Sequence, residues 1–106
     1  MDDCIFCRIA KKEAPAEIVK ETDNLIVFKE LHPKAPIHLL IVPKKHLLDI
    51  TQCDDALWTE IKKVALEVSG EKSPKAFRLV VNAGDATMVK HMHVHFLGEV
   101  GVEREV

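Results

Sequence analysis

Three histidines alternate with apolar residues late in the chain, in the stretch HMHVHF at residues 91–96. Successive side chains of a β-strand point to opposite faces, so we expect His91, His93 and His95 to share one face. The apolar residues between them fix this register, because a slip of one residue would bury the histidines and expose the core. Imidazole serves as nucleophile, general base or metal ligand near neutral pH, so the run indicates chemistry. The alternative is three polar residues on a solvent-facing strand.

The geometry of a regular strand excludes one metal ion bound by all three histidines. Residues two apart are separated by about 6.5–7 Å along a strand, and residues four apart by about 13 Å. Zinc–nitrogen bonds measure only about 2.0–2.1 Å. The three side chains are therefore expected to do different work.

Two cysteines near the start of the sequence, Cys4 and Cys7, have the C-x-x-C spacing at which two thiolates chelate one zinc ion. His46 follows a predicted strand, and together with His91 it would complete a Cys₂His₂ site. A closed site of this kind stabilises structure and leaves no open position for substrate. The alternatives are two reduced thiols without a ligand, or a redox pair. The redox alternative is disfavoured because no thioredoxin-like βαβ pattern surrounds the cysteines.

The central histidine, His93, is the candidate nucleophile. An imidazole attacks phosphorus when its other nitrogen is held by an acceptor such as a carbonyl. His38 lies in another predicted strand, where it either approaches the same face or is a half-buried polar residue. Covalent catalysis would divide one difficult hydrolysis into two easier displacements, with no metal in the chemical step.

The elements expected to position these residues are short strands and one long helix. A short helix is predicted over CIFCRIAKKE, before Pro15, and a longer one over residues 54–69, with Asp54 at its start and Gly70 at its end. The buried face of the longer helix is predicted to contain Leu57, Trp58, Ile61, Val64, Ala65 and Val68. Strands are predicted for EIVKE, NLIVFKE, IHLLIVP, AFRLVV and HMHVHFL. This order is typical of an α+β fold in which a helix covers an antiparallel sheet.

Length and composition exclude several classes of protein. A chain of 106 residues, 47% apolar and 30% charged, is expected to form one domain over residues 1–106. Its net charge of −2 offers no footprint for nucleic acid, and no apolar run approaches the roughly 20 residues of a membrane span. Three cysteines, of which Cys53 stands alone, do not form a disulfide framework, and the start is not typical of a signal peptide. We therefore expect a cytoplasmic protein that binds neither nucleic acid nor membrane.

Four blocks of the sequence, in this order, resemble the Hint branch of the histidine triad (HIT) superfamily: CIFCRIAKKEAPAEIV, FKELHPKAPIHLLIVPKKH, FRLVVNAG and HMHVHFLG. The resemblance implies the α+β HIT fold, with a five-stranded antiparallel sheet in each protomer, one main helix and a short N-terminal helix. It implies a homodimer joined through the central helix and a strand. It also implies binding of purine nucleotides such as AMP and hydrolysis of nucleoside phosphoramidates or related AMP conjugates. A related branch hydrolyses dinucleoside polyphosphates, which is the alternative activity.

The same resemblance assigns roles by position. His93 matches the nucleophile that attacks the α-phosphorus and becomes transiently nucleotidylated, while His38 and His95 match the histidines that support it. Members with an N-terminal C-x-x-C bind structural zinc through the four positions proposed above. The other positions that match the nucleotide site are Asn82 near phosphate and ribose, Glu30 at the ribose hydroxyls, and Ile5, Phe6, Ile9, Phe28 and Leu31 around the base.

The loop before the triad departs from the family pattern. Relatives carry a glycine-rich GGQS or GQT, where this chain has the shorter GDATMVK. Met88 stands where a hydroxyl would contact the phosphate or leaving group, and a thioether donates no hydrogen bond. A well-placed donor of this kind is worth about 10²–10³ in rate. Nucleotide binding with little turnover is therefore a second hypothesis, and a zinc-stabilised dimeric adaptor is a third.

Three further positions near the expected site stay open. Glu30 stands where the family usually has Asp, so its carboxylate reaches one methylene further. His32 and Lys34 lie in the segment LHPKAP, between two prolines or beside them. They are either additional phosphate contacts or solvated loop residues, and we favour the second interpretation.

Overall fold

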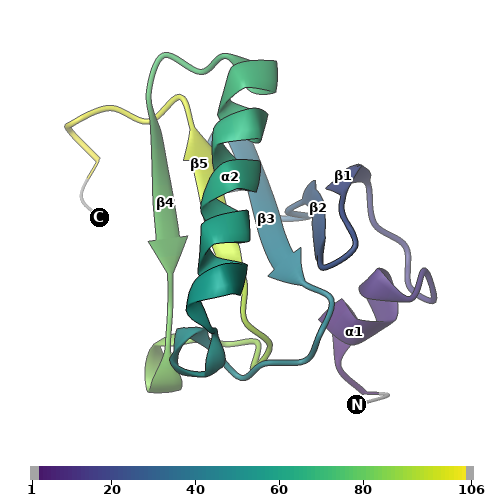
Figure 1. Cartoon of the computed structure of the whole chain (residues 1–106). Helices are drawn as coiled ribbons and strands as arrows, with labels where there is room; N and C mark the ends of the chain where they lie inside the picture. The colour runs from purple at the N-terminus through teal and green to yellow at the C-terminus, as the bar shows by residue number, and fades with distance from the viewer. Residues whose placement is uncertain (1–2, 105–106) are drawn as a thin grey trace.

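A five-stranded antiparallel sheet forms the centre of the protein in a computed structural model that describes residues 3–104 (Figure 1). Helix α2 (Asp55–Lys72) covers one face of this sheet, and the short helix α1 (Ile5–Ala10) packs on the other face. The α+β fold predicted from the sequence is confirmed. The strands, in the spatial order β1-β2-β3-β5-β4, are β1 (Ile18–Glu21), β2 (Leu25–Lys29), β3 (Ile37–Pro43), β5 (Val94–Gly98) and β4 (Phe77–Val81).

Two apolar cores, one on each face of the sheet, explain why β2 and β3 read as continuous hydrophobic runs. Alternate residues of each strand face α2 or α1, so both sets are removed from water. The core under α2 contains Leu25, Val27, Leu39, Ile41, Leu47, Ile61, Val64, Ala65, Val68, Met92, Val94 and Phe96. The core under α1 contains Phe6, Ile9, Ile26, Phe28, Leu40 and Val42.

Helix α2 begins as predicted and ends later than predicted. The carboxylate of Asp54 accepts a hydrogen bond from the first turn and caps the helix. Gly70 was expected to end the helix, but α2 continues through it to Lys72. The helix ends at Ser73, which adopts the left-handed conformation with φ of 49°, immediately before Pro74. The proline restricts the residue that precedes it, so it is Pro74 rather than the glycine that fixes the end.

Two residues of the predicted buried face of α2 are not fully buried, since Leu57 is only partly buried and Trp58 is exposed. Trp58 is 41% exposed, at the margin of the apolar stripe that packs on the sheet. Ile61, Val64 and Val68 are almost fully buried, as predicted. None of the helices within residues 3–104 has the length and apolar character that crossing a membrane requires.

The strand that carries the triad begins later than predicted, at Val94 rather than at His91. The segment before Val94 leaves the ladder because its polar groups have other partners. The Met92 amide donates to the carbonyl of Leu47 at 2.7 Å, and the His91 ring bonds to the carbonyl of Pro43. The expected alternation nevertheless survives, since the apolar residues of the run belong to the core under α2.

Candidate functional site

Four side chains from three distant segments converge where α1, the end of β3 and the segment before β5 meet. The ligand atoms of Cys4, Cys7, His46 and His91 all lie within 4.8 Å of one another. Sγ of Cys4 is 3.3 Å from Nδ1 of His91, and Sγ of Cys7 is 3.2 Å from Nδ1 of His46. Two thiols and two imidazoles at these separations can hold a metal ion, and the four residues are those proposed from the sequence.

Local structure explains how this cluster is built. Cys4 caps α1, and its Sγ accepts the amide of Cys7 at 3.5 Å, so one helical turn brings both thiols together. His91 is fully buried, and its Nε2–H donates to the carbonyl of Pro43 at 2.7 Å, which leaves Nδ1 free to face the sulfurs. Burial and the neighbouring Cys4 thiol raise the pKa of Cys7, so cation binding and thiol proton release are coupled.

The ring of His93 is held in one orientation by its neighbours. Its Nδ1 lies 2.8 Å from the carbonyl oxygen of His91, and because a carbonyl only accepts, this nitrogen carries the proton. The lone pair therefore lies on Nε2. The ring of Phe6 packs edge-to-face against it, with the ring centroids 5.0 Å apart. An imidazole held by a carbonyl with a free Nε2 has the form that a nucleophile requires.

His38 and His95 form a second unit, in which hydrogen bonds assign both ring protons. The backbone N–H of Lys34 donates to Nδ1 of His38 at 2.9 Å, so the proton of the neutral ring is on Nε2. That Nε2 lies 2.9 Å from Nδ1 of His95, which must accept. His95 consequently carries its proton on Nε2 and offers an N–H donor beside His93.

Burial keeps both rings of this pair uncharged near neutral pH. Desolvation, together with the neighbouring His93 and His38, lowers the pKa of His95 to about 4. Desolvation also lowers the pKa of His38, and Glu30 opposes this effect. A neutral pair is what the assigned chain of donors and acceptors needs.

Two adjoining cavities open beside these histidines. The larger, of about 330 Å³, is lined by His93 and His95, and the smaller, of about 220 Å³, is mostly apolar. The nucleotide-binding residues predicted from the sequence all line one cavity or both. Those in the larger cavity are Phe6, Glu30, Asn82, Met88, His93 and His95. Those in the smaller cavity are Ile5, Phe6, Ile9, Phe28, Glu30 and Leu31.

His38 lies outside these two cavities, behind His95, and lines a separate recess on the far side of the pair. The ribose candidate Glu30 lines both cavities and therefore marks their junction. His32 and Lys34 are exposed, as expected of loop residues, yet each lines one of the two cavities.

No sequence pattern indicated Thr87, which also lines the larger cavity. Its side chain is buried, and its Oγ1 donates to the carbonyl of Val89 at 2.9 Å. The adjacent Met88 is 99% exposed at the rim of the cavity. A loop without periodicity does not show which of its side chains turns inward, so Thr87 could not be selected from the pattern.

Two side chains outside the cavities hold the loop that contains Met88. Oδ2 of Asp49 accepts the amide of Gly84 at 3.0 Å, and Nζ of Lys90 donates to the carbonyls of Gly84 and Thr87. Hydrogen bonds from Thr51 and from the Gly84 amide keep the pKa of Asp49 below its usual range. Gly84 has φ of 61°, so this loop still requires a glycine at its start.

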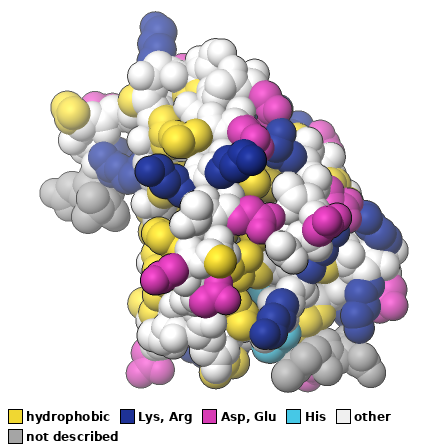
Figure 2. Space-filling model, in the orientation of Figure 1, with side chains coloured by type: hydrophobic (Ala, Val, Ile, Leu, Met, Phe, Trp, Pro, Cys, Tyr) yellow, Lys and Arg dark blue, Asp and Glu magenta, His cyan; other side chains and the backbone are white. Residues whose placement is uncertain are grey.

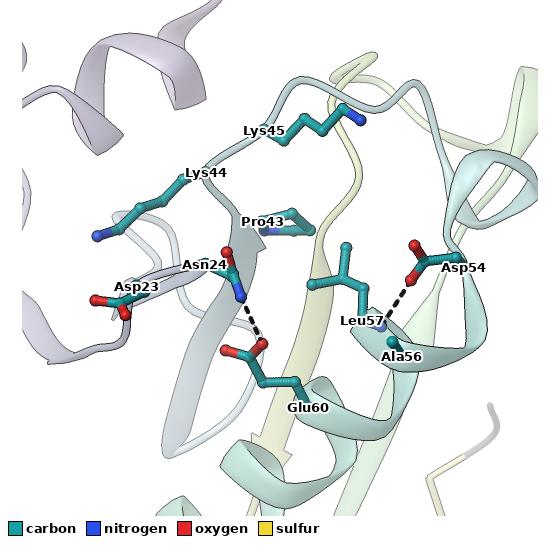
Figure 3. Close-up of a pocket in the computed structure, with 9 residues that line it drawn as sticks. All are labelled: Asp23, Asn24, Pro43, Lys44, Lys45, Asp54, Ala56, Leu57 and Glu60. Carbon is teal, nitrogen blue, oxygen red and sulfur yellow. Dashed lines mark hydrogen bonds between the residues drawn. The ribbon is translucent and has the colours of Figure 1, made fainter.

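A third cleft, of about 290 Å³, lies on the α2 side of the sheet (Figure 3). Asn24 donates to Glu60 at 3.0 Å, and Asp54 caps α2 at the opposite side of this cleft. None of the residues predicted to do chemistry is among the described residues that line it. The contact between Asn24 and Glu60 attaches the turn between β1 and β2 to the helix.

Known proteins resemble this chain over almost its whole length. The HIT domain model matches residues 11–101, which leaves Cys4 and Cys7 just outside the match. Protein HitA of Neisseria gonorrhoeae is 35% identical over 104 residues, covering 92% of this chain and 97% of that protein. A HIT family hydrolase from Clostridium thermocellum is 33% identical, with a TM-score of 0.92 and coverage of 100% of this chain and 98% of that one. A hypothetical histidine triad nucleotide-binding protein from Sulfolobus tokodaii is 28% identical, with a TM-score of 0.81 and coverage of 90% and 68%. The chain therefore belongs to the HIT family.

Proposed function

We propose that the protein is a nucleotide hydrolase that cleaves purine nucleoside phosphoramidates or related AMP conjugates through a nucleotidyl intermediate on His93. The observation that carries this proposal is the state of the His93 ring. Its Nδ1–H is bound to a backbone carbonyl, and its free Nε2 belongs to a ring that lines a cavity large enough for a phosphate and ribose. The relatives named as a hydrolase and as a nucleotide-binding protein support the same class of activity.

The proposed reaction has two displacements at the α-phosphorus. Nε2 of His93 donates its electron pair to phosphorus, the P–N bond to the leaving group breaks, and the departing amine takes a proton from water. In the second step water attacks phosphorus, the P–Nε2 bond breaks, and the electron pair returns to the ring. The proton lost by that water balances the one taken by the amine, so the products are AMP and the free amine.

The residues around His93 divide the substrate among them. The Nε2–H of His95 is a donor for the phosphate oxygens, which gain charge in each transition state. Glu30, at the junction of the cavities, suits the ribose hydroxyls, and the apolar smaller cavity suits the base. Asn82 lines the phosphate side of the larger cavity.

Zinc is the metal we propose for the Cys₂His₂ cluster. A tetrahedron with zinc–sulfur bonds of about 2.3 Å and zinc–nitrogen bonds of about 2.0–2.1 Å has sulfur–nitrogen edges of about 3.5 Å. The sulfur–nitrogen distances of 3.2, 3.3 and 3.5 Å are close to this value. The ion would tie α1 to the segment that carries His93, and it takes part in no chemical step.

A homodimer is the assembly we propose, joined through α2 and the edge strand β4. Figure 2 shows hydrophobic side chains along the edge of the molecule where these two elements lie in Figure 1. Trp58 and Leu66 of α2 and Phe77 and Leu79 of β4 are all exposed. A contiguous apolar surface beside an open strand edge is typical of an interface. The three free cysteines suit a reducing compartment, so we propose a cytoplasmic location.

The test of the proposed activity is hydrolysis of adenosine 5′-phosphoramidate by the wild type, His93→Ala and a control variant, Gln52→Ala, remote from the cavities. We expect AMP release by the wild type and the control and a loss of at least about 10³-fold in His93→Ala. Undiminished release in His93→Ala would reject this nucleophile. If the wild type binds AMP saturably but does not hydrolyse the phosphoramidate, the second candidate function, a nucleotide-binding module, is favoured. The specific observation for this candidate is the exposed Met88, which supplies no hydrogen-bond donor. Faster cleavage of a diadenosine polyphosphate would favour that substrate class instead.

A further inference from the structure

The segment that follows β5 turns back and contacts the loop between β2 and β3. Nη1 of Arg104 donates to the carbonyl oxygen of Lys34 in that loop. The backbone of Arg104 is itself held, because Nη1 of Arg78 in β4 donates to its carbonyl oxygen at 2.8 Å. Two arginines therefore fix the position of the Lys34 peptide relative to the sheet.

Lys34 connects this contact to the histidine pair. Its carbonyl accepts from Arg104, while its amide donates to Nδ1 of His38. His38 in turn donates from Nε2 to Nδ1 of His95. The hydrogen bonds thus run in series from the end of the described chain to the ring that lines the larger cavity.

We propose that Arg104 is a positioning residue, which fixes the ring protons of His38 and His95 by holding the Lys34 loop in place. The part of this proposal that concerns catalysis rests on the proposed function, whereas the part that concerns ring protons does not. Without the bond from the Lys34 amide, the His38 proton is free to occupy either ring nitrogen. With its proton on Nδ1, His38 can no longer donate to His95, and His95 can turn a lone pair instead of an N–H toward the phosphate.

The charges around His38 act in opposite directions on its pKa. Burial lowers this pKa most, Glu30 raises it, and Arg104 and Lys34 lower it. Lys29 and Lys72 line the recess on the other side of the His38 ring. The ring of His95 contacts the His38 ring directly. Arginine suits this position because its guanidinium presents several N–H donors in a fixed planar arrangement.

The experiment is nitrogen NMR of the imidazole rings in the full-length, zinc-loaded protein at pH 7, with His38→Gln and His95→Gln used to assign the signals. Wild type and the control Val102→Ala, a change at a fully exposed neighbour, are expected to show a single tautomer, protonated at Nε2, for both rings. Arg104→Ala is expected to show mixed tautomers for His38 and a higher pKa for that ring. Arg104→Lys should restore the positive charge and therefore bring the pKa of His38 part of the way back to its wild-type value. It should not restore the single tautomer.

The catalytic readout uses the same variants. For Arg104→Ala we expect kcat on adenosine 5′-phosphoramidate to fall about 10-fold with KM little changed, because the lost N–H acts on transition-state charge. Unaltered tautomers and an unaltered kcat in Arg104→Ala would overturn the proposal. If that variant fails to fold, Arg78→Ala gives the same test by releasing the backbone of Arg104. A wild type that shows no turnover would contradict the proposed function, while the NMR signals alone would still decide the role of Arg104.

Discussion

Hydrogen bonds to three imidazoles assign every ring proton of the candidate catalytic site. His93 is protonated at Nδ1 by its bond to a carbonyl, and His38 and His95 are protonated at Nε2 by a chain that begins at a backbone amide. One ring therefore presents a lone pair, and the ring beside it presents a donor. The sequence could identify the three residues through their resemblance to a family, but not their protons. The positions of the protons depend on the Lys34 amide and the His91 carbonyl. Every residue has these backbone groups, so the order of residue types does not show which of them bonds to a histidine.

A single substitution of Met88 tests whether the lack of a hydrogen-bond donor at this position limits the rate of hydrolysis. We predict that Met88→Ser raises kcat on adenosine 5′-phosphoramidate by about 10-fold or more, because a hydroxyl can donate to the phosphate or leaving group. Met88→Ala is the matched control, since it removes the thioether without adding a donor. Equal kcat values for the two variants would show that the hydroxyl has no role at this position.

The pKa of His95 predicts how stability depends on pH. In the folded protein this pKa is about 4, below the ordinary value near 6.5, so the unfolded chain binds more protons between these pH values. Stability contributed by the neutral ring is therefore present above pH 6.5 and is lost as the pH falls toward 4. We expect His95→Gln to reduce the difference in unfolding free energy between pH 7 and pH 5 by roughly 1 kcal/mol after solvent screening. Urea unfolding of both zinc-loaded proteins measures this, and an identical pH dependence would refute the assignment.

At the scale of elements, the segments predicted from hydrophobic pattern correspond to elements of the structure, and the errors fall at their ends. The core of α2 was recognised because its apolar residues recur at helical spacing, while its end was misplaced because Pro74 dominates over Gly70. β5 is shorter than its alternating pattern predicted, because side-chain and loop partners replace the ladder before Val94. Cys4 and Cys7 could be paired from spacing alone, since one turn of α1 separates them. Their partnership with His46 and His91 is a long-range contact that spacing left open.

We expect α1 to depend on the proposed metal site more than any other element, because its apolar face is small and the two cysteines lie at its N-cap and in its first turn. We predict about one equivalent of zinc per chain, lost in Cys7→Ser and retained in Cys53→Ser, which changes a free thiol outside the cluster. Loss of the ion should lower Tm by at least about 10 °C, because a change of only 2–3 kcal/mol has this effect in a domain of this size. Elemental analysis and thermal unfolding measure the two quantities. Wild-type protein that was purified without chelator and contains no zinc would contradict the proposed metal.

In the whole molecule, the two faces of the sheet carry different features. The face under α1 carries both cavities and the histidine pair, and the face under α2 extends to an exposed apolar margin at β4. The family resemblance predicted the five-stranded sheet correctly. Hydrophobic pattern alone placed Trp58 in the core, because an exposed residue at the margin of the apolar stripe has the same helical periodicity as a core residue.

Two copies of the chain are predicted to associate through α2 and β4. We expect the wild type to sediment as a dimer and Leu79→Glu to sediment as a monomer, because the substitution places a charge in the middle of the proposed interface. Ile18→Glu, at an exposed isoleucine of β1 on the opposite edge of the sheet, is the matched control and should remain a dimer. A dimeric Leu79→Glu, or a monomeric wild type, would exclude this interface.

Trapping the proposed covalent bond between His93 and the nucleotide is the decisive test of the mechanism. The wild-type protein would be mixed with adenosine 5′-phosphoramidate, quenched in base within milliseconds to preserve a phosphorus–nitrogen bond, digested and examined by mass spectrometry. We predict an adenylyl group on the peptide that contains His93, located on that residue by fragmentation and absent from His93→Ala. Release of AMP by the wild type with no adduct at any quench time, or an adduct on His38 or His95 instead, would exclude His93 as the nucleophile.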